Sequence, residues 1–186
     1  MTRVEGSGVV LRAFHEDELD QLVEVAATTP VGDGAHWGPR GRDELRARIR
    51  ESGVWTPSGV LTFAVEQGGR LVGDVQARTA RGAMPPGVFE LGIEVFDETD
   101  RGRGLGAAAL AELSSHLFRE EAAIRVQLTT DVANAAMRRV AERLGFGFEG
   151  VLRGFMPTDD GPRDYAIYGL TRRDWETKKD AWTRTS

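Results

Sequence analysis

The chain has 186 residues, of which 40% are hydrophobic and 28% are charged, and its formal net charge is −5 at pH 7. This length suits a single domain, and the negative charge argues against nucleic acid as a partner. The chain contains no cysteine, which excludes disulfides, thiolate nucleophiles and cysteine-based metal sites. Its apolar runs are too short to cross a membrane and it starts with no secretory leader, so we expect a cytoplasmic protein.

The first half of the chain predicts strands and helices in alternation. Apolar residues recur at helical spacing after an acid-rich start, and two strand-like runs flank the turn Gln67-Gly68-Gly69. Between the two predicted helices, residues 28–41 are rich in glycine and proline, which indicates a loop. The predicted elements are a strand over 9–13, helices over 15–27 and 42–51, and strands over 60–66 and 70–78.

The second half continues the alternation and contains the most unusual segment. A strand over 88–96 is followed by a glycine-rich stretch and a helix over 107–121, and Gly145 is the expected end of a later helix. We expect one α/β domain over residues 1–186, with a mixed, mostly antiparallel, twisted sheet and flanking helices. The tail from about residue 176 is expected to be disordered. The remaining predicted elements are strands over 124–130, 146–152 and 164–170, and a helix over 134–144.

The glycine-rich stretch joins a strand to a helix and has the composition of a phosphate-binding loop. The first N–H groups of a helix lack intrahelical partners, and the helix dipole adds positive charge there. Gly104 and Gly106 have no side chain to hold a phosphate away, while Arg101 and Arg103 can add charged contacts. A P-loop would need Lys and Ser or Thr where Ala107 and the next alanine stand, and the glycine spacing does not fit a dinucleotide-binding fingerprint.

The segment from Arg101 to Gly106 reads R-x-x-G-x-G, which resembles the acyl-CoA pyrophosphate loop of the GNAT N-acetyltransferase superfamily. Other stretches match in the family's order and resemble its ribosomal-protein N-terminal (RimJ/RimL-type) branch. The resemblance implies the GNAT fold, in which a splayed pair of parallel strands binds acyl-CoA. The matching stretches are Leu11-Arg12, Leu71-Val72-Gly73, Phe89-Glu90-Leu91-Gly92, Asn134 through Leu144-Gly145-Phe146, and Glu149-Gly150-Val151-Leu152-Arg153.

The resemblance also implies acetyl-CoA as co-substrate and assigns residues to it. Backbone N–H groups of the loop would hold the pyrophosphate, and those near Val95 would hold the thioester carbonyl. Asn134 would contact the pantetheine arm, although a helix N-cap role alone also explains an asparagine at this position. The expected acetyl-CoA-binding residues are Val95, Phe96, Arg101, Gly102, Arg103, Gly104, Leu105, Gly106, Ala107 and Asn134.

Glu90 is the expected general base. On the predicted strand over 88–96, Glu90 and Glu94 share one face, with Gly92 between them leaving room for a ligand. An amine must be neutral to attack a thioester, and a carboxylate can accept its proton directly or through water. The resemblance gives this role to Glu90, with Glu94 as the weaker candidate. The alternative is a glutamate on a polar strand face, paired with an arginine across the sheet.

No general acid is assigned. Relatives carry tyrosine or serine in the second cofactor helix, where this chain has Ala141 and Met137. A thiol with a pKa of about 8.5 needs little protonation to leave at neutral pH. Tyr165 and Tyr168 are interpreted as core or surface residues, and Trp37 either lines an acceptor pocket or fills the core. The three histidines, His15, His36 and His116, have no metal-site spacing, so no metal is expected.

The expected activity is acetyl transfer from acetyl-CoA to a primary amine by direct attack. The resemblance favours a protein or peptide N-terminal α-amine as acceptor, with a small amine such as an antibiotic or a polyamine as the alternative. A non-catalytic acyl-CoA-binding protein is the rival hypothesis, because Met137 and Ala141 stand where relatives have proton donors. No membrane partner is expected, and a homodimer is compatible with the sequence.

Overall fold

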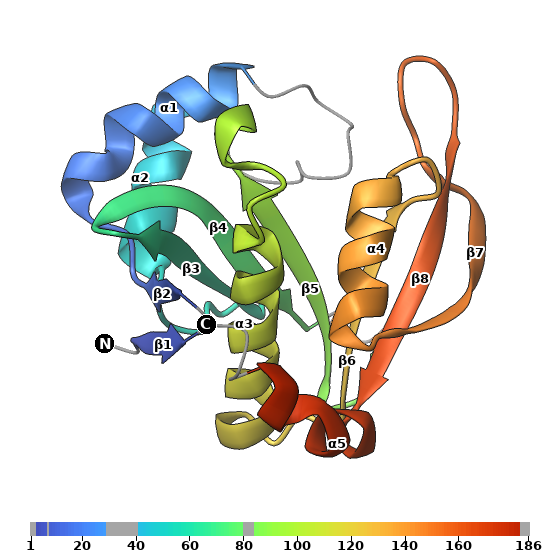
Figure 1. Cartoon of the computed structure of the whole chain (residues 1–186). Helices are drawn as coiled ribbons and strands as arrows, with labels where there is room; N and C mark the ends of the chain where they lie inside the picture. Colours follow the sequence, from blue (N-terminus) through green and yellow to red (C-terminus); the bar gives the residue numbers. More distant parts are fainter. Residues whose placement is uncertain (1–2, 7, 29–40, 80–83, 183–186) are drawn as a thin grey trace.

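The computed structural model describes residues 3–6, 8–28, 41–79 and 84–182, and its centre is one eight-stranded sheet (Figure 1). The strand order is β1-β2-β3-β4-β5-β6-β8-β7, and every neighbouring pair is antiparallel except β5 and β6. The predicted mixed α/β sheet with one parallel pair is therefore confirmed. The strands are β1 (Val4–Gly6), β2 (Val9–Arg12), β3 (Val60–Gln67), β4 (Arg70–Arg78), β5 (Val88–Val95), β6 (Arg125–Asp131), β7 (Gly147–Met156) and β8 (Arg163–Thr171).

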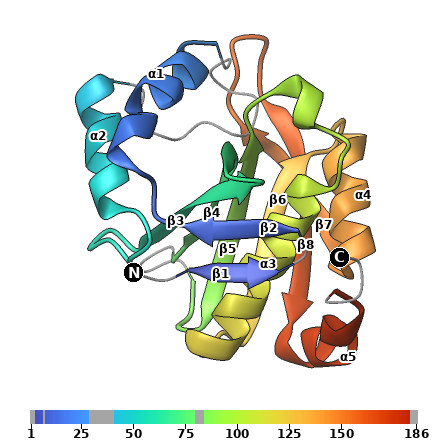
Figure 2. The same cartoon turned by 60° about the vertical axis from the view of Figure 1, so that its left-hand side comes forward.

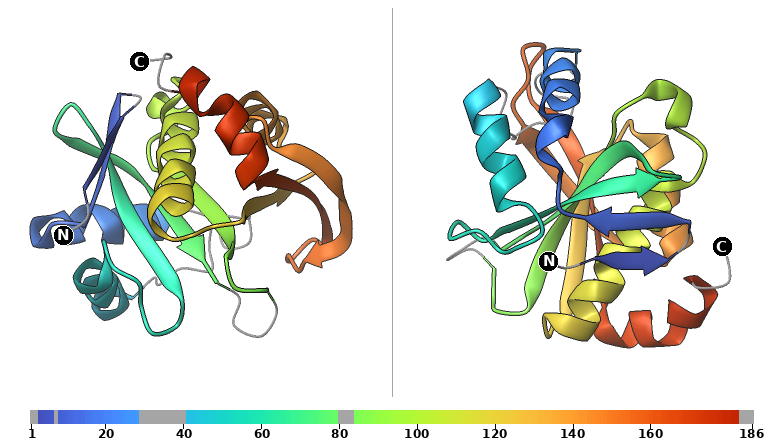
Figure 3. Two further views of the ribbon diagram at one scale, coloured as in Figure 1. Left: turned by 90° about the horizontal axis from the view of Figure 1, so that it is seen from below. Right: turned by 90° about the vertical axis from the view of Figure 1, so that its left-hand side faces the viewer.

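Helices cover both faces of the sheet (Figures 2 and 3). Helix α3 lies across one face, with α4 and α5 beside it, and α1 and α2 lie together on the other face. The predicted helix over 42–51 is confirmed, and the predicted helix over 107–121 begins two residues earlier. The helices are α1 (Leu19–Thr28), α2 (Arg42–Glu51), α3 (Leu105–Glu120), α4 (Ala135–Leu144) and α5 (Arg172–Trp182), with short 3-10 turns η1 (Glu16–Glu18) and η2 (Glu98–Asp100).

Two apolar cores hold these layers together. The larger lies between the sheet and α3, where alanines such as Ala109 and Ala111 let the helix approach the strands closely. The smaller lies under α1 and α2. Glycine also allows close approach within the sheet, because a Cβ on Gly73 would collide with the carbonyl oxygen of Glu94 on β5. Gly145 ends α4 in the left-handed conformation at φ 85°, as the sequence predicts.

The parallel strands β5 and β6 are paired over a short distance only. Their register covers Val88 with Arg125, Phe89 with Val126, and Glu90 with Gln127. Beyond Glu90, β5 stays paired with β4 as far as Val95, while β6 stays paired with β8 as far as Asp131. The two strands therefore diverge from Glu90 onward, and the splayed pair expected from the resemblance is present.

The structure corrects the prediction for the C-terminal tail. Residues 176–182 are helical and not disordered, because α5 continues to Trp182, the last residue that the structure describes. Trp175 and Trp182 are only 4% and 8% exposed, and Trp175 stacks on Phe118 with its indole N–H donating to the Ser115 hydroxyl at 3.2 Å. The two tryptophans are seven residues apart, so they lie on one helix face among residues that are otherwise polar.

Strand β1, which the sequence analysis missed, has three residues and is too short for a periodic pattern.

Candidate active site

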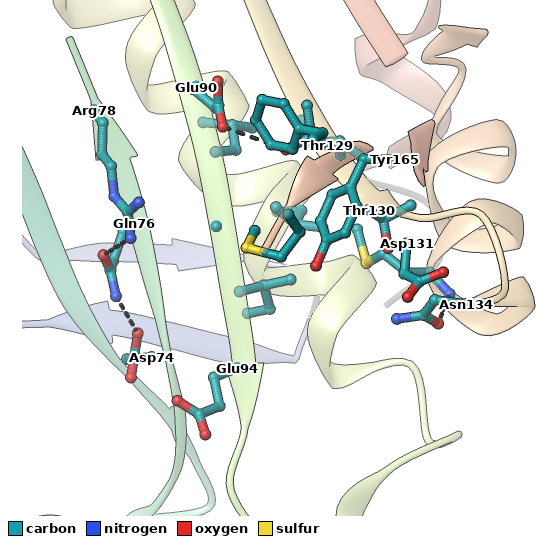
Figure 4. Close-up of a pocket in the computed structure, with 18 residues that line it drawn as sticks. Asp74, Gln76, Arg78, Glu90, Glu94, Thr129, Thr130, Asp131, Asn134 and Tyr165 are labelled. Atoms are coloured by element: carbon teal, nitrogen blue, oxygen red, sulfur yellow. Dashed lines mark hydrogen bonds between the residues drawn. The ribbon is translucent and has the colours of Figure 1, made fainter. Parts of the chain in front are cut away.

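A cavity of about 540 Å³ lies where β5 and β6 diverge (Figure 4). Strands β4, β5 and β6 supply most of its polar lining, and α4, β7 and β8 close the remaining side. Gly92 lies on its wall, and a Cβ built there would meet no atom within 4 Å. The missing side chain therefore leaves open space between the two charged residues of the same strand face, Glu90 and Glu94.

Glu90 lies at the closed end of the splay and lines the cavity. Its half-buried carboxylate accepts hydrogen bonds from Gln127 Nε2 at 3.3 Å and from Thr129 Oγ1 at 3.4 Å, both long for bonds of this kind. Arg78 is its cross-strand neighbour, but that guanidinium donates to Gln76 Oε1 at 2.9 Å, and no ion pair joins it to Glu90 in the described part of the chain. The carboxylate is weakly held and faces open space, so it is able to accept a proton from a bound molecule.

The glycine loop at the start of α3 leaves backbone N–H groups available. Gly104 is the N-cap of α3 with φ 86°, and no side chain caps the helix. The first intrahelical bond runs from Ala108 N to Gly104 O at 2.9 Å, so the N–H groups of Leu105, Gly106 and Ala107 precede it. These groups and the helix dipole together favour an anion at this end of the helix.

Asp100 fixes the arginines around this loop. Its carboxylate is 2% exposed and accepts from Arg70 Nη2 on both oxygens and from Arg103 Nη1, each at 2.8 Å. Arg101 forms an ion pair with Glu98 at 3.3 Å. Both predicted loop arginines are thus exposed but already paired with acids of the same segment. The sequence analysis missed Asp100 and Arg70, because their meeting depends on the position of β4.

The turn before the loop is held by Asp97. Its carboxylate accepts from the hydroxyl of Thr99 at 2.7 Å and from the backbone N–H of Thr99 at 2.8 Å. These two hydrogen bonds stabilise the ionised form and hold the pKa of Asp97 below its usual value. Asp97 therefore stabilises the turn η2, from which the chain passes into the glycine loop.

Gly106 is not required by the fold itself. Its φ is not in the left-handed region, and a Cβ there would make only ordinary contacts, 3.6 Å from Ile93 Cγ1 and 3.7 Å from Val95 Cγ2. Gly104, in contrast, needs glycine for its backbone conformation. The absent side chain at Gly106 leaves space beside the open N–H groups, which fits the close approach of a pyrophosphate such as that of acetyl-CoA.

The predicted acetyl-CoA residues do not all lie together. Asn134 lines the cavity with Glu90, whereas Val95, Phe96 and residues 101–107 lie outside its lining. The Phe96 N–H already donates to Val72 O at 3.0 Å, and its ring packs against the smaller core, so this N–H is not available for a thioester. Asn134 caps α4 by accepting from Met137 N at 3.0 Å, and its amide nitrogen has no partner among the described residues.

Tyr165 is a cavity residue that the sequence analysis assigned to packing or to the surface. It is 2% exposed, and Figure 4 shows its hydroxyl directed into the cavity from β8. Tyr168 is not among the residues that line the cavity, and its hydroxyl accepts from Arg138 Nε at 3.1 Å and donates to Glu142 Oε1 at 3.2 Å. The two residues are three apart on one strand, so strand alternation already implies opposite faces. Trp37 and His36 lie outside the described residues.

The cavity has further polar residues on β4 that the sequence analysis passed over. Asp74, Gln76 and Arg78 alternate along the strand and face the cavity (Figure 4). Their period of two, within the second strand of the predicted hairpin, was the signal that could have identified them. Within the described ranges, no three His, Asp or Glu side chains are grouped so as to hold a metal ion, and no helix is long and apolar enough to cross a membrane.

Known proteins share both the sequence pattern and the fold. A curated relative from Bacillus subtilis, "Putative ribosomal N-acetyltransferase YdaF", is 33% identical over 48% of this chain and 49% of its own length. The mycothiol acetyltransferase of Salinispora arenicola is 30% identical over 75% of this chain and 45% of its own length. The chain therefore spans about half the length of these curated relatives.

Solved structures agree with the fold. RimJ of Mycobacterium smegmatis, solved in complex with a CoA-disulfide, superposes with a TM-score of 0.70 at 20% identity, covering 95% of this chain and 92% of that one. The acetyltransferase (GNAT) domain family matches residues 9–147, which include β2 to β6, the glycine loop and α4. With the splayed strands and the open start of α3, this match shows that the chain belongs to the GNAT acetyltransferase family.

Proposed function

We propose that this GNAT acetyltransferase transfers an acetyl group from acetyl-CoA to the N-terminal α-amine of a peptide or protein, by direct attack of the amine. The observation that carries the proposal is the position of Glu90, a weakly held carboxylate at the closed end of the splay between β5 and β6. Acetyl-CoA supplies the reactive thioester, and the residues of this chain bind it, position the amine and remove its proton.

Residues at the start of α3 are suited to hold the acetyl-CoA pyrophosphate. The N–H groups of Leu105, Gly106 and Ala107 precede the first helical bond, and the space beside Gly106 is open. Arg101 and Arg103 add positive charge at the rim. The free amide nitrogen of Asn134 is available for the pantetheine arm while its oxygen caps α4.

Glu90 is proposed to accept the proton of the attacking amine, because only the neutral amine is nucleophilic. The cavity provides no proton donor at Met137, and Ala141 is buried in the larger core. The Tyr165 hydroxyl reaches the cavity from β8 and is the candidate donor to the departing thiol. The departing thiol needs little protonation at neutral pH, because its pKa is about 8.5.

An α-amine fits this site better than a lysine side chain. A single half-buried carboxylate must remove the proton from the acceptor amine. An α-amine with a pKa of about 8 is neutral far more often at pH 7 than a lysine amine with a pKa of about 10.4. The name of the Bacillus subtilis relative, a ribosomal N-acetyltransferase, supports a protein acceptor. The name of the Salinispora arenicola relative, mycothiol acetyltransferase, keeps a small-molecule acceptor as the second candidate.

The test is a comparison of matched peptides, one with a free α-amine and one N-blocked with an internal lysine. We expect a higher kcat/KM for the free α-amine, with mass spectrometry locating the acetyl group on it. A preference for the lysine would contradict the pKa argument. Turnover of small amines alone would favour the second candidate, and tight acetyl-CoA binding without turnover of any amine would favour a non-catalytic binding protein.

A further inference from the structure

Gln127 contacts the carboxylate of Glu90 from the neighbouring strand. It lies on β6 directly beside Glu90 on β5, at the last paired position before the two strands diverge. Its Nε2 donates to Glu90 Oε2 at 3.3 Å. The two ends of an amide have opposite hydrogen-bonding character, so the orientation of the Gln127 amide decides whether Glu90 meets a donor or an acceptor.

Arg125 fixes that orientation. It lies two residues before Gln127 on β6, and therefore on the same face of the strand, and its Nε donates to Gln127 Oε1 at 3.2 Å. A guanidinium N–H can only donate, so the amide oxygen faces Arg125 and the amide nitrogen faces Glu90. A reversed amide would turn Nε2 toward a cation and Oε1 toward a carboxylate, and both hydrogen bonds would be lost.

Glu149, on the edge strand β7, holds Arg125 in turn. Its Oε1 accepts from Arg125 Nη1 at 2.7 Å and its Oε2 accepts from Nη2 at 2.5 Å, which together fix the plane of the guanidinium. Arg125 holds the pKa of Glu149 below its usual value, so Glu149 is ionised and the ion pair is intact at neutral pH. Side chains from β7, β6 and β5 thus form one series of hydrogen bonds that ends on Glu90.

The ion pair crosses β8 at a glycine. Strand β8 lies between β6 and β7, and Gly169 is paired with Gln127 on one side and with Gly147 on the other (Figure 1). A Cβ on Gly169 would collide with Arg125 Nη1 and Nη2 and with Glu149 Oε1. The φ of Gly169 lies outside the left-handed region, so its backbone conformation does not require glycine. The space that a side chain would fill here is occupied by the ion pair.

We propose that Arg125 and Glu149 are positioning residues, which keep the Glu90 carboxylate directed into the cavity by fixing the amide of Gln127. This inference rests on the proposed function, because it takes Glu90 as the general base. The contact from Gln127 is long, so the carboxylate can still accept a proton, while a donor of fixed orientation restricts the directions in which it turns. Neither Arg125 nor Glu149 lines the cavity, so both act on the reaction through Gln127.

The kinetics of two variants test this role. Glu149→Gln removes the charge that holds Arg125, and Gly169→Ala displaces the ion pair while changing no polar group. Each should lower kcat by about threefold to tenfold, the effect of losing one hydrogen bond, and leave KM for acetyl-CoA unchanged. The melting temperature should stay close to that of the wild type, because the ion pair is partly exposed.

Each variant has a matched control. Gly147→Ala adds the same methyl group beside Gly169, but its Cβ would meet only Gly169 O, at 3.8 Å. Asp43→Asn removes a charge from an exposed ion pair with Arg46. Both controls should keep the wild-type kcat. Glu149→Gln adds no volume, so it carries the test if Gly169→Ala does not fold.

A double variant separates positioning from packing. Once Glu90→Gln has removed the base, the ion pair has nothing left to position, so Glu149→Gln should cause no further loss of kcat in that background. A loss of the same size in both backgrounds overturns the inference, because the ion pair would then act elsewhere. A wild-type kcat in both Glu149→Gln and Gly169→Ala overturns it as well.

The side-chain amide of Gln127 gives a measurement that does not need turnover. The resonances of its Nε2 protons in ¹⁵N NMR spectra of the full chain depend on the charge of the group that accepts from them. Glu90→Gln should therefore shift these resonances in the wild-type background, and much less in the Glu149→Gln background, where the amide is no longer held. Equal shifts in the two backgrounds overturn the inference. An unchanged kcat in Glu90→Gln refutes the proposed function alone, and the Gln127 resonances then decide the inference.

Discussion

Two buried aspartates lie in the site region, and their hydrogen bonds differ. Asp100, in the loop before α3, is 2% exposed and receives Arg70 on both oxygens and Arg103 on one. Asp74, in the cavity wall, is 1% exposed and has both of its neighbours on one oxygen. The loop carboxylate is therefore satisfied by the protein alone, and the wall carboxylate is not.

This difference indicates what each end of the site does. A satisfied carboxylate between two arginines fixes the shape of the loop before any ligand arrives, so the open N–H groups of α3 are already in position. A half-satisfied buried carboxylate in the cavity wall costs stability instead. Changes at the loop end should therefore affect stability and acetyl-CoA binding, and changes at the cavity end should affect turnover and acceptor binding.

The largest expected effect is at the closed end of the cavity. Glu90→Gln should lower kcat by about 10²–10⁴, because the attacking amine loses its general base, while acetyl-CoA affinity stays nearly unchanged. The loss should be greatest at low pH, where the amine most needs deprotonation, and smaller as pH approaches the pKa of the amine. Steady-state kinetics across pH measure this. A loss of equal size at every pH would indicate that Glu90 positions the acceptor instead.

The next effect tests the loop carboxylate. Asp100→Asn should lower the free energy of unfolding by about 1.5 kcal/mol without any ligand present, since charge-assisted bonds to two arginines are weakened. Thermal denaturation of the free protein measures it, with Asp43→Asn as a control at an exposed ion pair. An unchanged melting temperature would mean that the loop keeps its shape without Asp100, and the proposed contrast with Asp74 would fail.

A third prediction tests the space beside the open N–H groups. Gly106→Val should weaken acetyl-CoA binding at least tenfold, about 1.4 kcal/mol, because a branched side chain would occupy the approach of the pyrophosphate. The fold should persist, since a Cβ at this position makes only ordinary contacts. Gly104 is less suitable, because its φ of 86° strains any other residue. Calorimetry gives the affinity, and Ala27→Val on the exposed end of α1 is the control for the added side-chain volume. Unchanged affinity would reject the pyrophosphate site.

The smallest effect concerns the tyrosine pair on β8. Tyr165→Phe should lower kcat by about threefold to tenfold with little change in KM for acetyl-CoA, because the thiol leaves readily even without a donor. Tyr168→Phe is the matched control, since its hydroxyl bonds to Arg138 and Glu142 and not to the cavity. Equal kinetic losses in both variants would assign Tyr165 to packing, which is one of the two interpretations that the sequence left open.

Most of the helices and strands were predictable because their signals are local. Three of these signals each depend on only a few neighbouring residues. They are the alternation of residues along β5, the asparagine cap and glycine end of α4, and the glycine-rich start of α3. The assignment of Glu90 to a strand face with room at Gly92 depended on strand alternation alone, and the structure has the same arrangement. The tail prediction failed because α5 is held by Trp175 and Trp182 against the larger core, and its own residues are largely polar.

The order of predicted helices and strands thus specified the α/β fold class, and the resemblance of the glycine loop and its neighbouring stretches specified the family. Packing between distant segments specified which side chains meet. Asp74 on β4, Tyr165 on β8 and Asp100 beside Arg70 have no local signal for their partners, because those partners come from other strands and helices. A strand pattern gives the face on which a side chain lies, whereas the neighbours it meets there depend on strand order, register and the helix that covers the face.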